Sequence, residues 1–108
     1  MRQSNYVRLI VSVPITHADA IREALGQAGA GQQGNYSYCS GSYPSTGRFK
    51  PLTGANPAIG RVGELETVAE ETITTICHQD LLPQVVAAIK KVHPYEAVPI
   101  DIIPRFEV

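Results

Sequence analysis

The sequence has no excess charge of one sign and few cysteines. Nine Lys and Arg stand against ten Asp and Glu, which gives a formal net charge of −1 at pH 7. Nucleic acids and anionic membrane surfaces attract basic proteins, so we expect neither as a partner. The two cysteines, Cys39 and Cys77, are too few for a disulfide scaffold, and we expect both to be free thiols.

A long hydrophobic run is also lacking. The N-terminus leads into an apolar stretch over residues 6–13, which is too short for a signal peptide or a bilayer span. We therefore expect a cytoplasmic protein. Its 108 residues predict a single domain over residues 1–108, because domains commonly hold about 100–150 residues.

Four segments have the β-branched residues or the alternating pattern of strands. They are residues 6–13, 35–40, 64–78 and 98–104. The first has hydrophobic side chains at every second position from Val7 to Val13, which places them on one face. Prolines in the last segment favour a position at the sheet edge, where a missing N–H does least harm.

A first helix is predicted over residues 17–28, where hydrophobic residues recur at helical spacing. Thr16 is the expected N-cap, because its hydroxyl can accept a hydrogen bond from a free N–H of the first turn. The helix is expected to end at Gly29, Gly31 and Gly34, since glycine adopts positive φ without steric cost.

A second helix is predicted after Asp80, which is the expected N-cap. An apolar stripe runs from Leu82 to Ile89. Pro94 disfavours the α conformation in the residue before it, so we expect this helix to end at His93.

The order βαββαβ predicts an α+β fold of the ferredoxin-like split βαβ type, with an antiparallel four-stranded sheet and both helices on one face. The opposite face would still carry Tyr6, Ile10 and Ile103. Exposed apolar patches commonly mark interfaces, so this face predicts a homo-oligomer.

Residues 41–63 hold five glycines and three prolines. We expect this segment to be irregular apart from a short extended piece over residues 48–52. Within this segment, residues 54–63 could form a phosphate-binding loop, because glycines expose backbone N–H groups to an anion. The loop lacks the Lys-Ser/Thr ending of a P-loop, so tight turns are the favoured interpretation.

His93, Tyr95 and Glu96 place an imidazole, a phenol and a carboxylate in one turn. In a structural interpretation His93 faces the negative helix end, Tyr95 packs and Glu96 is solvated. In a functional interpretation His93 and Glu96 supply two metal ligands or a proton-transfer pair. The other candidate ligands do not have the spacing of a known metal site; they are His17, Cys39, Cys77 and His78. No metal or cofactor is therefore assigned. No G-x-S-x-G elbow occurs, so no catalytic residue is assigned either.

Four blocks in order resemble the domain inserted into bacterial members of the NIF-three family (NGG-one-interacting factor three). They are residues 34–40, 47–60, 63–68 and 93–96. The domain would stand alone here, as in short YqfO-type proteins. The resemblance implies the fold of the signalling protein PII and of the divalent-cation tolerance protein CutA, and it implies assembly through the sheet, as a trimer before a dimer.

The resemblance also implies a regulatory role in which a small ligand or a protein partner binds. The residues implied for binding are Asn35, Tyr36, Arg48, Phe49, Gly54, Asn56, Gly60, His93, Tyr95 and Glu96. Full-length relatives hold a dinuclear metal centre in two flanking halves and are often labelled GTP cyclohydrolase homologues. Those halves are not in this sequence, and Ala97 stands where the family usually has a second glutamate.

An oligomeric binding module rather than an enzyme is thus the leading hypothesis. A divalent-metal-binding or metal-dependent hydrolase-related protein is the first alternative. The second alternative is a structural role, as a cap or partner in a larger assembly.

Overall fold

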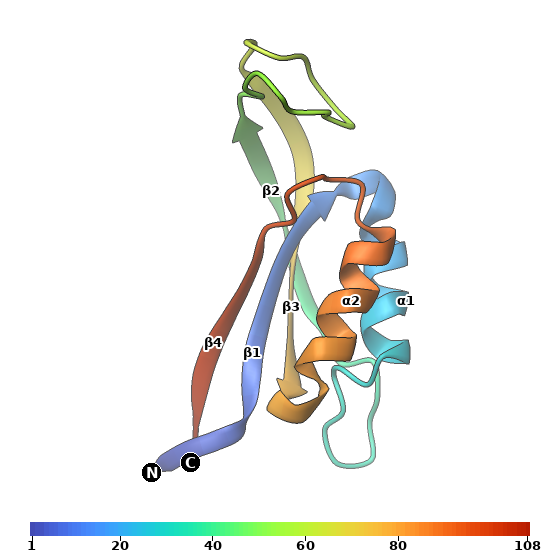
Figure 1. The fold of residues 1–108 in the computed structure, drawn as a ribbon. Coiled ribbons are helices and arrows are strands. Elements are labelled where there is room, and N and C mark those ends of the chain that lie inside the picture. The colour runs from blue at the N-terminus through green and yellow to red at the C-terminus, as the bar shows by residue number, and fades with distance from the viewer.

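In the computed structural model, which describes residues 1–108, four strands form one antiparallel sheet and two helices cover one of its faces (Figure 1). The elements in chain order are β1 (Arg2–Pro14), α1 (Ala18–Gln27), β2 (Gly41–Phe49), β3 (Glu66–His78), α2 (Leu82–Val92) and β4 (Ile100–Glu107). The strands are ordered β2-β3-β1-β4. The expected ferredoxin-like α+β fold is confirmed, and β4 lies at an edge as predicted.

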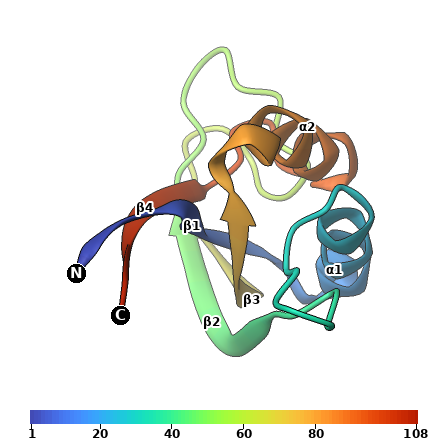
Figure 2. The same ribbon diagram turned by 90° about the horizontal axis from the view of Figure 1, so that it is seen from below.

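The pairing of β1 with β3 determines which side chains enter the core. Leu9 lies opposite Thr75 and Val11 opposite Ile73, so the odd-numbered residues of both strands point to the helices. Figure 2 shows α1 and α2 together on that side of the sheet. The core joins these strands to Ile21 of α1 and to the stripe of α2, as the hydrophobic spacing predicts.

The second strand was expected over residues 35–40, and this expectation is wrong. Those residues belong to a loop in which the N–H of Gly31 donates to the carbonyl of Ile76 and the N–H of Cys39 donates to the carbonyl of Gly31. A Cβ on Gly31 would lie 2.5 Å from the carbonyl oxygen of Cys39, and Tyr38 has a φ of 59°. The chain therefore turns back on itself here and cannot extend.

The strand forms instead within the glycine- and proline-rich segment that was expected to be irregular. β2 pairs with β3 from Gly41 opposite Thr74 to Phe49 opposite Glu66. Pro44 is tolerated because β2 is an edge strand, where one missing N–H leaves no ladder partner unsatisfied. Pairing with a long β-branched neighbour thus outweighs the weak strand propensity of β2.

Both predicted N-caps are wrong, because a short 3-10 turn precedes each helix. Before α1, Thr16 lies in such a turn, and its Oγ1 is hydrogen-bonded to Nδ1 of His17 at 2.8 Å. Before α2, the N–H of Asp80 donates to Nδ1 of His78 at 3.1 Å. The predicted helix end is confirmed, since His93 follows α2 with a ψ of 132°.

The sheet face opposite the helices is uncovered in the single chain except near Glu70, where Tyr95 lies against it. By register it carries Tyr6 and Ile10 from β1, Tyr43 from β2 and Ile103 from β4. Tyr43 and Ile103 are 55% and 44% exposed. We call this surface the open face. No helix of the chain is long and apolar enough to cross a bilayer.

Two isoleucines that differ in burial should contribute unequally to the stability of the fold. Ile89 is fully buried, so Ile89→Ala should lower the free energy of unfolding by about 2–5 kcal/mol through lost burial and a cavity. Ile15→Ala is the matched control, because Ile15 is 54% exposed and should change stability by about 0.5 kcal/mol or less. Urea unfolding of both variants measures the difference, and equal losses would contradict the assigned core.

Candidate functional site

A cavity of about 430 Å³ lies where the β2–β3 hairpin extends beyond the end of β1. β1 ends at Pro14 opposite Glu70, so residues 66–69 of β3 have no β1 partner. The loop after β2 lies at this end of the sheet, at the top of Figure 1, and the link from α2 to β4 passes below it, beside the end of β1. Residues from these segments and from the sheet line the cavity: Ser12, Gly47, Arg48, Phe49, Lys50, Pro51, Ala55, Pro57, Ala58, Ile59, Glu70, Tyr95, Glu96, Ala97 and Pro99.

His93 anchors the link from α2 to β4 on the end of β1. Its Nδ1 accepts the N–H of Tyr95 at 3.1 Å, so in the neutral ring Nε2 carries the proton and donates to the carbonyl of Ser12 at 2.8 Å. His93 is 7% exposed, and burial lowers its pKa. The buried neutral imidazole therefore holds the turn that follows it.

Tyr95 crosses from this turn to β3. Its hydroxyl donates to Oε2 of Glu70 at 2.5 Å, and its ring meets the ring of Phe49 edge-on with centroids 5.7 Å apart. The pKa of Tyr95 is raised well above its usual range, mainly by burial and secondly by the hydrogen bond to Glu70. Tyr95 is therefore a neutral donor that fixes one oxygen of the carboxylate.

Glu70 needs a glycine diagonally across from it on β2, where Ser45 is the direct partner of Glu70 and Gly47 pairs with Val68. A Cβ on Gly47 would come within 2.5 Å of the carboxylate atoms of Glu70. The absence of a side chain at that position lets the carboxylate lie across β2 beside the cavity. Glu70 is 6% exposed, which is rare for a charged side chain.

Glu96 connects the turn to the loop. Its Oε2 accepts the N–H of Asn56 at 2.9 Å. Arg48 and Lys50 are exposed at the margin of the cavity, and neither forms an ion pair. The cavity therefore combines apolar walls with two carboxylates and two cations that do not neutralise one another by direct contact.

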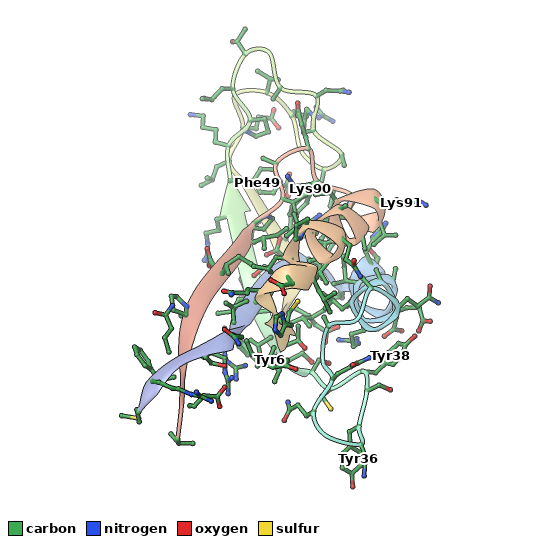
Figure 3. The ribbon with its side chains drawn as sticks, turned by 60° about the horizontal axis from the view of Figure 1, so that its bottom comes forward. Tyr6, Tyr36, Tyr38, Phe49, Lys90 and Lys91 are labelled. Atoms are coloured by element: carbon green, nitrogen blue, oxygen red, sulfur yellow. The ribbon has the colours of Figure 1, made fainter.

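Most residues predicted for binding meet here, but two lie elsewhere. Those at or beside the cavity are Arg48, Phe49, Gly54, Asn56, Gly60, His93, Tyr95 and Glu96. Of these, Arg48, Phe49, Tyr95 and Glu96 line it, His93 and Asn56 support the lining, and Gly54 and Gly60 turn the loop. Asn35 and Tyr36 lie in the loop between α1 and β2. Figure 3 shows Tyr36 far from Phe49.

Sequence reasoning missed Glu70, Ser12 and Gly47. Glu70 and Glu71 stand in a β-branched strand, so one of the two must point to the helix side. Glu71 does so and meets Arg22 of α1 at 3.2 Å. The remaining signal for Glu70 was a charged residue on the other face of the strand. The strand register then shows that Gly47 lies diagonally across from it on β2.

The structure does not bring together a set of side chains that could bind a metal ion. No group of three or more His, Cys, Asp and Glu lies close enough to hold an ion. Both ring nitrogens of His93 are occupied by backbone groups. Cys77 points into the core, where burial raises the pKa of its thiol, whereas His78 lies on the opposite face.

Comparisons with known proteins identify relatives that are longer than this chain. No family model matches. A curated protein of Halalkalibacterium halodurans named "GTP cyclohydrolase 1 type 2 homolog" is 53% identical over 97 residues, which cover 90% of this chain and 26% of that protein. The chain thus spans about a quarter of the length of such relatives.

Among solved structures, this chain likewise matches one part of a longer protein. The crystal structure of a Bacillus cereus protein related to NIF3 is 40% identical with a TM-score of 0.83, covering 99% of this chain and 27% of that one. The PII-like protein CutA from Nostoc sp. PCC 7120 is 18% identical with a TM-score of 0.65, covering 90% of this chain and 78% of that one. The second likeness shows the fold alone.

The buried imidazole predicts a pH dependence of stability. Because burial lowers the pKa of folded His93, the unfolded chain takes up a proton near its pKa of about 6.5 that the folded chain resists. The contribution of His93 is therefore present above that pH and is lost as the pH falls. Urea unfolding from about pH 7.5 down to about pH 5 should show this loss. It should be reduced in His93→Gln and kept in His17→Gln, and an unchanged slope in His93→Gln would contradict it.

Proposed function

This chain is homologous to one segment of the NIF3-related proteins and has the fold of CutA, and from this premise we propose that it is an oligomeric binding module. Its small ligand binds in the cavity beneath the loop after β2. The open face of the sheet joins it to further copies. The loop itself is the surface that a protein partner contacts.

The cavity is the main observation that supports this proposal. Its volume is about 430 Å³, which lies within the range of about 300–1,000 Å³ that is typical of ligand sites. Its walls are mostly apolar, and a few polar groups converge on it, among them Tyr95, whose pKa is raised. This is the usual composition of ligand sites. The hydrogen bonds of His93 and Tyr95 hold the site in place before any ligand arrives.

The loop after β2 links ligand and partner. Pro51, Ala55 and Ile59 of this loop line the cavity, while Leu52 and Leu65 point outward and are each 72% exposed. Its only side-chain bond to the rest of the chain is the one from Asn56 to Glu96. A segment with so few bonds has low local stability, so occupancy of the cavity would order the outward surface for a partner.

The open face supports assembly. Tyr6, Tyr43 and Ile103 are large apolar side chains without cover in the single chain. Contiguous exposed apolar surface on a small domain commonly marks an interface. The resemblance to PII and CutA favours a trimer. For the metal-dependent alternative we find no comparable observation, since no ligand cluster is present.

Filling the cavity should abolish ligand binding. Ala58 lines the cavity and Leu52 of the same loop does not, so Ala58→Trp should weaken fragment binding about tenfold or more, while Leu52→Trp should leave it unchanged. A fragment library observed by ligand-detected NMR measures both. Fragments that bind Ala58→Trp as well as the native chain would contradict the cavity as the site.

Charges on the open face should separate the copies. Sedimentation at micromolar concentration should show an oligomer for the native chain and a monomer for Tyr43→Asp combined with Ile103→Asp, because a carboxylate buried in an interface without a partner is costly. Leu52→Asp is the control, since Leu52 lies outside the open face, and it should keep the oligomer. A native monomer would refute the assembly.

A further inference from the structure

Glu70 is a buried carboxylate without a countercharge in the chain. Only 6% of its surface is exposed. The ion pairs of the chain use Asp19, Glu71 and Asp80, and none of them includes Glu70. Buried charges are normally paired, because an isolated charge loses its hydration without compensation. The chain therefore supplies Glu70 with no positively charged partner.

The two oxygens of Glu70 differ. Oε2 accepts the hydroxyl of Tyr95 at 2.5 Å, whereas Oε1 accepts no hydrogen bond from the chain. No side-chain polar atom is both fully enclosed and without a partner, so Oε1 keeps some open surface. Because Glu70 lines the cavity, this surface is reached from the cavity. The site therefore presents an acceptor that is ready for a donor from outside.

Nearby cations of the chain do not supply the charge. Arg22 lies across the sheet on the helix side and contacts Glu71. Arg48 and Lys50 line the cavity but are exposed, and neither reaches the carboxylate within ion-pair distance. Water screens their exposed charges, while an interaction with Glu70 occurs where water is largely excluded.

We infer that the ligand of the cavity is a small organic cation whose ammonium, amidinium or guanidinium group donates to Oε1 of Glu70. This inference rests on the proposed function and names its ligand class. The apolar body of the ligand lies against Pro57, Ala58 and Ile59. Charge-assisted hydrogen bonds to a carboxylate are stronger than neutral ones, so the charged group determines orientation and much of the specificity.

The walls favour an organic cation over a metal ion. Calcium and similar ions require about six or more oxygen ligands. The cavity offers two carboxylates, and Oε2 of Glu96 is occupied by the N–H of Asn56. Prolines, alanines and an isoleucine form most of the remaining lining, which suits a hydrocarbon or aromatic body. An anionic ligand would instead be repelled by Glu70.

Three probes of similar shape and different charge test whether the cavity prefers a cationic ligand. Benzamidinium, benzamide and benzoate are titrated into the native protein, and binding is followed by amide chemical shifts of residues around the cavity. Benzamidinium should bind about tenfold more tightly than benzamide, which corresponds to about 1.4 kcal/mol, and benzoate should bind most weakly. In Glu70→Gln the affinity for benzamidinium should fall to that for benzamide.

Glu66→Gln is the matched control, because Glu66 is on the same strand but does not line the cavity, and it should keep the preference. Equal affinities for the three probes, or a preference for benzoate, would overturn the cationic ligand and leave a binding cavity intact. Absence of binding by all three would also overturn the inference, and the fragment experiment with Ala58→Trp then decides separately on the proposed function. If Glu70→Gln does not fold, the comparison among probes on the native chain decides alone.

Discussion

The antiparallel register between β1 and β3 is the constraint on which the rest of the structure depends. With Leu9 opposite Thr75, the apolar alternation of both strands faces the helices and forms one core. A shift by one residue would turn that entire set to the other face. The same register ends β1 at Pro14 and leaves the far end of the β2–β3 hairpin without a neighbour. The cavity lies at this unpaired end.

The turn after α2 is both structural and part of the site. His93 holds the end of β1, Tyr95 reaches Glu70, and Glu96 binds the loop after β2. Each side chain joins a different element, so the two interpretations of this turn drawn from the sequence are not exclusive. A turn that ties three segments together also shapes the space between them, and this is how a small domain obtains a preformed cavity.

A large part of the fold followed from the sequence. The hydrophobic spacing from Leu82 to Ile89 and the alternation from Val7 to Val13 are strong local signals that tertiary contacts reinforce. The second strand and both N-caps did not follow. Tyr36 and Tyr38 have the residue types of a strand, yet Gly31 and Cys39 close a loop around them. Short 3-10 turns moved Thr16 and Asp80 away from the helix starts, and such turns leave little trace in composition.

By itself the sequence determined the order of elements, the core stripes and the density of functional groups at His93, Tyr95 and Glu96, because these depend on local propensity and periodicity. The tertiary structure alone decided that Arg48 and Phe49 join that turn while Asn35 and Tyr36 lie in a separate loop. It alone placed Glu70 over Gly47 with one oxygen free. Residues 23 positions apart become neighbours only through strand register, which is set by the packing of the whole sheet and not by any local pattern.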